Sequence, residues 1–139
     1  MLVELLQAGP GYGVDEGLNC AETILYGANI AYKLGFDPDD LKVAAGFGSG
    51  MAIESVCGAL TAVIMVLGRI LVDERAKGSR IDELTKELFD AYTEKMGSIY
   101  CAPLKEEHRT DAVKCRLVVM KAAEILDEII ERETQQSLK

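Results

Sequence analysis

The sequence lacks tryptophan and contains a single histidine, His108. One histidine excludes a site built from several imidazole ligands of the same chain. His108 lies among Glu106, Glu107 and Arg109, and we expect its ring to be solvated. The alternatives are a fourth metal ligand or a proton donor to a nearby thiolate, both of which are common roles of histidine.

Basic residues are also in short supply. The 139 residues include 15 Lys and Arg against 23 Asp and Glu, so the formal net charge is −8. Nucleic acids and anionic membranes are bound by clustered Lys and Arg, and the composition excludes both as expected partners. With 49% hydrophobic residues, the chain predicts one folded domain over residues 1–139 rather than a disordered segment.

No apolar run is long enough for a membrane span. The longest run, residues 56–67, is shorter than the roughly 18 to 20 residues that a span needs. The N-terminal residues carry an acidic Glu4 and no basic stretch typical of a secretory signal. We therefore expect a cytoplasmic protein whose four cysteines are metal ligands, catalytic thiols or buried side chains rather than a disulfide framework.

Apolar residues recur at helical spacing along the chain, and no stretch alternates with the period of a strand. The pattern predicts an all-α, single-domain bundle of about four to six helices around a central apolar helix. Ala59, Val63, Leu67 and Ile70 should face inward on that central helix. The expected helices cover residues 2–8, 20–34, 37–43, 53–73, 80–96 and 110–133, and the tail after residue 133 should be frayed. Residues 45–50, AGFGSG, should not be helical because three of the six are glycine.

Two of the cysteines are predicted at helix starts. Asn19 and Glu22 have the spacing of a capping box, which places Cys20 in the first turn of its helix. Cys57 should lie in or near the first turn of the central helix. Unpaired backbone N–H groups at a helix start favour a thiolate. We expect Cys57 to have the most acidic thiol, with Cys20 next.

The other two cysteines are predicted in different settings. Cys101 should lie in a connection, and Cys115 one turn into the last helix, facing the core and least reactive. The cysteines are separated by 36, 43 and 13 residues, so there is no CxxC pair. This excludes the local motifs of zinc ribbons, thioredoxin-like proteins, ferredoxins and covalent haem attachment. A shared site requires the four sulfurs to converge at one end of the bundle; otherwise they are small buried side chains.

The glycine-rich segment GFGSGMAIES resembles a nucleotide-binding loop only superficially. A dinucleotide fingerprint needs a preceding strand, and a P-loop needs GK[ST]; neither is present. These glycines then indicate close backbone packing before a helix. Alternatively, Gly48, Gly50 and Gly58 let the backbone approach a cofactor held by Cys57.

Farther along, acidic residues of the last helix should form its solvated face: Asp127, Glu128, Glu131 and Glu133.

Five segments carry a family resemblance. They are GLNCAETIL, AAGFGSGM, CGALTAVIMVLG, GSIYC and CRLVVMKAAEIL. In their order and in the spacing of their cysteines, they resemble the C_GCAxxG_C_C family of redox-active proteins over about residues 17–130. One departure is Ala62, which stands where the CGAxxG motif ends in glycine.

The resemblance implies redox chemistry by the four cysteines. A similar cysteine arrangement in the iron–sulfur part of split-Soret cytochromes implies a cluster, although this chain lacks their CxxCH. We therefore expect electron transfer through an iron–sulfur cluster held by Cys20, Cys57, Cys101 and Cys115, with a redox partner protein and an apolar face suited to a homodimer. One alternative is a metal-free dithiol/disulfide oxidoreductase or redox sensor that uses Cys57 and Cys20. Another is an interaction module with a structural Zn²⁺. Whether the protein is an enzyme stays open at this point.

Overall fold

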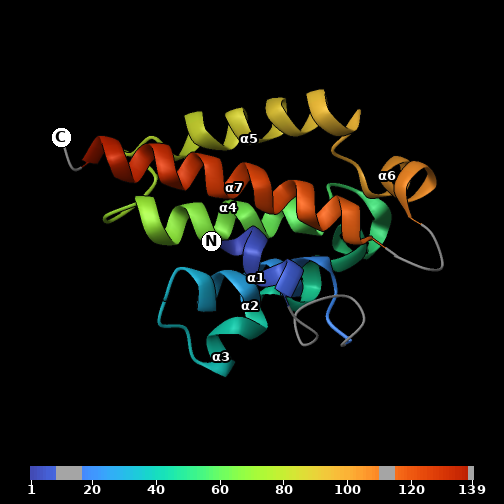
Figure 1. The fold of residues 1–139 in the computed structure, drawn as a ribbon, viewed down its shortest axis with the longest axis horizontal. Helices are drawn as coiled ribbons and strands as arrows, with labels where there is room; N and C mark the ends of the chain where they lie inside the picture. The colour runs from blue at the N-terminus through green and yellow to red at the C-terminus, as the bar shows by residue number, and fades with distance from the viewer. Residues whose placement is uncertain (9–16, 110–114, 138–139) are drawn as a thin grey trace.

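Helix α4 (Gly58–Leu71) runs through the middle of the molecule, as Figure 1 shows. The structure is a computed structural model, and it describes residues 1–8, 17–109 and 115–137. Helix α4 packs against α2 (Cys20–Ala31), α5 (Ile81–Met96) and α7 (Arg116–Ser137). The remaining elements are α1 (Leu2–Ala8), α3 (Pro38–Leu41), the 3₁₀ helix η2 (Lys42–Phe47), the short turn η3 (Gly50–Glu54) and α6 (Cys101–His108). The fold is therefore the predicted all-α bundle around a central helix.

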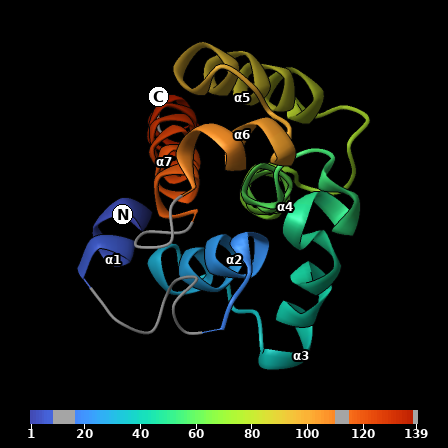
Figure 2. The ribbon, with the colours of Figure 1, turned by 90° about the vertical axis from the view of Figure 1, so that its right-hand side faces the viewer.

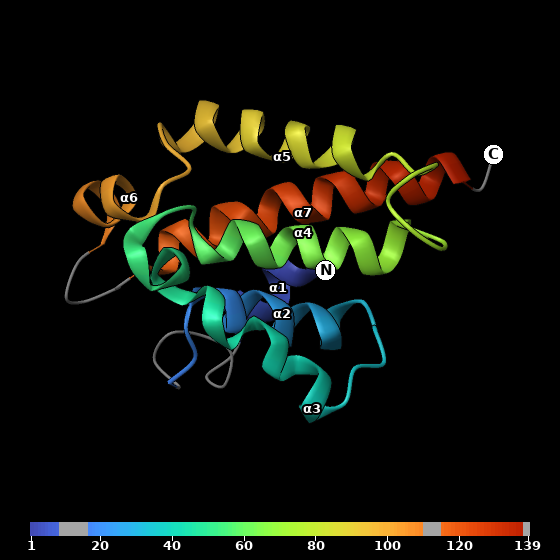
Figure 3. The ribbon, with the colours of Figure 1, turned by 180° about the vertical axis from the view of Figure 1, so that it is seen from behind.

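The helices form three layers. Helix α5 lies on one side of the α4–α7 pair, and α1, α2 and α3 lie on the other, as the front and back views agree (Figures 1 and 3). Helix α6 lies across one end of the bundle (Figure 2). Within the described ranges there is no strand, and Val56 and Tyr100 form one isolated antiparallel bridge.

The inward face of α4 is confirmed at three of its four predicted positions. Ala59, Val63 and Leu67 are fully buried, whereas Ile70 is half-buried near the end of the helix. With 14 residues, α4 spans about 21 Å at 1.5 Å per residue, less than the roughly 30 Å of a bilayer core. In the part of the chain that is described, no helix has the length and apolarity to cross a membrane.

The predicted start of the central helix at residue 53 is wrong. Four non-glycine residues before α4 have left-handed backbone conformations, with φ between 53° and 65°: Ser49, Met51, Ala52 and Glu54. A right-handed helix cannot include them, so α4 begins only at Gly58. The expectation that residues 45–50 avoid helix is also partly wrong. The 3₁₀ helix η2 reaches Phe47 and buries Ala44 fully. A 3₁₀ helix needs only a few residues, so it can form in this short segment where an α-helix does not.

The predicted caps are confirmed at two helix ends. The Asn19 side chain accepts the Glu22 N–H at 2.9 Å, and the Glu22 carboxylate accepts the Asn19 N–H at 3.0 Å. Gly97 ends α5 with φ 85°. Helix α2 ends at Ala31 rather than near residue 34, because Lys33 turns left-handed.

Residues 101–108 form α6, where a connection was predicted. Pro103 lies in the first turn of this helix, where a missing backbone N–H costs nothing, so proline there does not argue against a helix. The C-terminal prediction is also wrong, since α7 continues to Ser137 through residues expected to fray. The expected start of the last helix at residue 110 lies outside the described residues.

Two carboxylates of α7 are not part of a solvated face. Asp127 accepts the N–H groups of Leu2 and Val3, each at 3.0 Å, and the hydroxyl of Tyr32. It thereby supplies the cap for the start of α1 from another helix. Glu133 is 8% exposed and pairs with Arg80 and Arg132.

Candidate cysteine site

All four cysteines lie at helix starts. Cys20 is the first residue of α2, and Cys57 immediately precedes α4, as the sequence predicts. Cys101 is the first residue of α6, and not part of a connection. Cys115 directly precedes α7, where its carbonyl accepts the Val119 N–H at 3.0 Å, so it is not one turn into the helix. The four helix starts meet at the end of the bundle that α6 covers (Figure 2).

The four side chains line one cavity of about 110 Å³. The expected convergence at one end of the bundle is therefore what the structure shows, although the cysteines come from four different helices. Three of them are less than a tenth exposed, and Cys20 is partly exposed. The rest of the lining is Asn19, Ser49, Gly58, Leu104, Lys105, Arg109 and Val118.

Two backbone hydrogen bonds fix the positions of Cys57 and Cys101 relative to each other. The Cys57 N–H donates to the carbonyl of Ile99 at 2.8 Å, and the Cys101 N–H donates to the carbonyl of Ser55 at 2.6 Å. These bonds flank the Val56–Tyr100 bridge. The segment before α4 and the segment before α6 are thus tied together, which fixes the relative position of the two helix starts.

The three glycines considered as cofactor contacts lie in different places. Gly58 lines the cavity, and a Cβ on it would stand 2.5 Å from the carbonyl oxygen of Phe47. A Cβ on Gly48 would overlap the amide of Asn19. Gly50 has φ 61°, and a Cβ there would stand 2.9 Å from the Cβ of Cys101. Protein atoms occupy the space beside Gly48 and Gly50, which accounts for glycine at both positions.

Cys57 does not have the most acidic thiol of the four, contrary to expectation. Burial raises its pKa to about 11, although the backbone N–H groups of Ala59 and Leu60 at the helix start oppose the shift. The desolvation of a buried thiolate outweighs the helix start here. Burial also raises the pKa of Cys101, against the opposing effect of the Lys105 ammonium, which hydrogen-bonds to it.

The acidic thiol belongs to Cys115, which was expected to be the least reactive. Its pKa is lowered by a hydrogen bond from Cys20 and by the charges of Arg109 and Lys105. The same hydrogen bond raises the pKa of Cys20, together with burial. The pair is best described as a Cys115 thiolate that accepts the S–H of Cys20.

The sequence interpretation missed two cavity residues, Lys105 and Arg109. They follow Cys101 by four and eight residues and line the same cavity. Residues four apart share a helix face. A helix starting at Cys101 would therefore have identified Lys105, whereas Arg109 follows the end of α6 in an extended conformation and has no such pattern. The cavity lining does not include His108, whose ring stands 3.4 Å from the carbonyl of Met96.

The thiols are not gathered around a single point. Among the described residues, no group of three or more Cys, His, Asp or Glu side chains stands close enough to hold one metal ion. The four cysteine side chains instead line the walls of one cavity.

Comparison with known proteins gives one match. A family model described as "Putative redox-active protein (C_GCAxxG_C_C)" matches residues 18–129, which include all four cysteines. No curated protein and no solved structure matches the chain. The match covers most of the chain, including the elements that form the cavity.

Proposed function

The chain belongs to the C_GCAxxG_C_C family of redox-active proteins, and from that premise we propose that Cys20, Cys57, Cys101 and Cys115 hold an iron–sulfur cluster for electron transfer to a partner protein. The observation that carries the proposal is the single cavity bordered by all four side chains. Four cysteine thiolates are the ordinary ligand set of such clusters.

The arrangement of the thiols fits a cluster better than a single zinc ion. A structural zinc site gathers four sulfurs about 2.3 Å from one centre. The described thiols do not converge in this way. A cluster with more than one iron, held by the same four thiolates, would not require them to meet at a single ion. The cavity has a volume of about 110 Å³, whereas one water molecule needs roughly 10 to 15 Å³. The cavity therefore has room for a group larger than a single ion.

The chain's own residues would supply three conditions for such a group. A bound cluster would accept and release one electron at a time. Burial of Cys57, Cys101 and Cys115 limits the contact of their side chains with water. The backbone N–H groups at the start of α4 act on the Cys57 sulfur, and the Lys105 ammonium acts on Cys101. Hydrogen bonds to sulfur and nearby charge are the factors by which a protein sets a cluster potential.

A second candidate function rests on the hydrogen bond between Cys20 and Cys115. The Cys115 thiolate would attack a disulfide of a partner and form a mixed disulfide, releasing one partner thiol. Cys20 would then attack Cys115, release the second partner thiol and close a Cys20–Cys115 disulfide. The dithiol loses two electrons and the partner disulfide gains them.

Anaerobic purification with a visible spectrum and iron, sulfide and zinc analysis separates these functions. The cluster predicts a coloured protein with iron and acid-labile sulfide, and Cys101→Ser should lose both. A colourless protein that oxidises reversibly by two thiols, at Cys20 and Cys115, would favour the dithiol. A colourless protein with one tightly held zinc would contradict both.

A further inference from the structure

Helix α6 and the residue that follows it present two cations to the cysteine cavity. Lys105 and Arg109 follow Cys101 at intervals of four residues, and all three line the cavity. We propose that these two side chains make the cavity selective for anions, so that a free reactant which reaches the thiols carries negative charge. This inference does not depend on the proposed function, because the charge selectivity rests on the residues that line the cavity.

The local charge is opposite to that of the whole chain. The net charge is −8, yet no carboxylate of the described residues belongs to the cavity lining. Both cations act on the same sulfur, since each lowers the pKa of Cys115. Lys105 also hydrogen-bonds to Cys101. Lys105 is half-buried and Arg109 is exposed, so water screens their charges in part and the potential in the cavity should depend on salt.

One carboxylate competes for Lys105 from outside the cavity. The Glu54 carboxylate lies 3.6 Å from the Lys105 ammonium, too far for a good hydrogen bond, and its side chain is 53% exposed. The Lys105 side chain is 26% exposed. Exposed ion pairs of this length are weak, so Glu54 neutralises Lys105 only in part. Removing Glu54 should therefore increase the selectivity, and removing Lys105 should decrease it.

The test compares two alkylating reagents on the reduced, metal-free protein. Iodoacetate is an anion and iodoacetamide is neutral, but the same thiolate attacks the CH₂ carbon of either reagent and displaces iodide. The ratio of their rates at one cysteine therefore reports the local potential and cancels the fraction of thiolate. Rates at Cys115 and Cys101 are measured by peptide mapping, at low salt and at about 0.5 M NaCl, where charges are screened within a few ångströms.

The proposal predicts graded changes in this ratio. Lys105→Met and Arg109→Met should each lower it about two- to fivefold at low salt, from a unit charge acting over several ångströms of partly aqueous medium. Glu54→Gln should raise it, and high salt should lower it in the unmodified protein. Lys86→Met is the matched control, because Lys86 is exposed on α5 and paired with Asp90 outside the cavity lining.

Two results would overturn the proposal: a ratio in the unmodified protein that does not change with salt, or ratios in folded Lys105→Met and Arg109→Met equal to that of Lys86→Met. The salt series needs no variant, so it decides the matter even if a substitution prevents folding. The alkylation test uses metal-free protein, so its outcome does not depend on the iron assay. If the protein holds no iron but shows the graded ratios, the proposed cluster is wrong and the anion selectivity stands.

Discussion

At the scale of single residues, the four cysteines share a position in their helices and differ in the protonation of their thiols. Each stands at a helix start, where backbone N–H groups favour a thiolate. The differences between their pKa values come from the groups around each sulfur. Burial raises the pKa of Cys57, whereas the S–H of Cys20 and two cations lower that of Cys115. The sequence could reveal the helix starts of Cys20 and Cys57, but not which thiols contact each other.

Cys115 should be the first cysteine to react in the metal-free protein. Its pKa is depressed, so its thiolate persists as the pH falls below the ordinary thiol value near 8.5, while Cys57, with a pKa raised to about 11, stays protonated. We expect Cys115 to be alkylated at least tenfold faster than Cys57 at pH about 6.5, with the gap narrowing as the pH rises through the pKa of Cys57. Peptide mapping over time measures both rates. A protein in which Cys57 reacts first would contradict this assignment.

The glycines of α4 provide a second test at this scale. Gly58→Ala should destabilise the protein by about 1 to 3 kcal/mol, because its Cβ would press on the Phe47 carbonyl, which is backbone and cannot rotate away. Gly68→Ala is the matched control on the same helix. No atom lies within 4 Å of the position its Cβ would take, and alanine favours helix, so stability should rise by up to about 1 kcal/mol. Urea unfolding of both variants provides the measurement, and equal effects of the two substitutions would contradict the close packing at Gly58.

At the scale of elements, local signals predicted helices well where a cap or a glycine marks the boundary. The Asn19–Glu22 box and Gly97 are examples. The prediction failed where the boundary depends on tertiary contacts. Ser49, Met51, Ala52 and Glu54 are left-handed in a segment where Gly50 lies against Cys101, and α6 forms where a connection was predicted. The contact between Gly50 and Cys101 joins residues about fifty positions apart, so no local sequence pattern predicts it.

Helix α1 depends on a carboxylate from α7. Seven residues form a marginal helix alone, so the cap from Asp127 and the burial of Leu2 and Leu6 must hold it in place. Asp127→Ala leaves two N–H groups and the Tyr32 hydroxyl without this acceptor, and should cost about 1 to 3 kcal/mol.

The matched control for this helix is Glu128→Ala, whose carboxylate is 69% exposed and lies 3.8 Å from Lys95. It should change stability by less than about 0.5 kcal/mol. Hydrogen exchange should show early opening of Leu5 and Leu6 in Asp127→Ala only. Unchanged exchange in that variant would mean that apolar packing alone holds α1.

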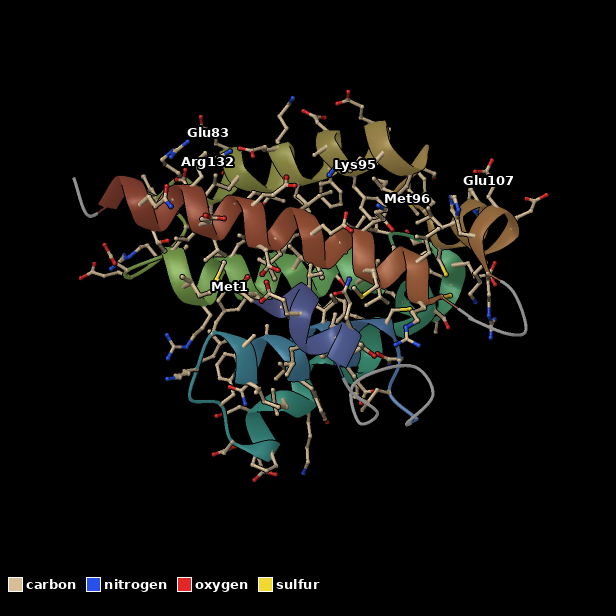
Figure 4. All side chains as sticks on the ribbon, in the orientation of Figure 1. Met1, Glu83, Lys95, Met96, Glu107 and Arg132 are labelled. Atoms are coloured by element: carbon tan, nitrogen blue, oxygen red, sulfur yellow. The ribbon has the colours of Figure 1, made fainter. Side chains whose placement is uncertain are left out.

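At the scale of the whole molecule, the two ends of the bundle are held by different interactions. The cysteine cavity occupies the end that α6 covers. At the other end, α5 and α7 are joined by ion pairs of Arg80 with Glu133 and of Arg132 with Glu87, the latter bidentate at 2.7 and 2.8 Å. Figure 4 shows Glu83 and Arg132 at this end, opposite Glu107 of α6. The sequence predicted the bundle and its central helix, but which charges meet across helices emerges only from the fold.

Loading the cysteine cavity should stabilise the whole bundle. A ligand bound only by the folded state adds about 3 to 4 kcal/mol at 100 to 1,000 times its Kd, which corresponds to a rise of roughly 5 to 15 °C in Tm for a chain of this size. We expect this rise when iron and sulfide are reconstituted anaerobically, and a smaller one in Cys101→Ser, measured by circular dichroism. A loaded protein that melts at the temperature of the metal-free form would show that the ligand does not connect the four helices.

The position of each cysteine at the start of its own helix has an evolutionary consequence. The site is defined by where helices begin, so the number of residues between cysteines is free to drift. Residues 72–80, which join α4 to α5 at the end away from α6, could lengthen by insertion without displacing any sulfur (Figure 1). Distant relatives of this chain are then better sought by four helix-initial cysteines than by fixed intervals, and the loop at residues 72–80 is the place to graft a partner-recognition module.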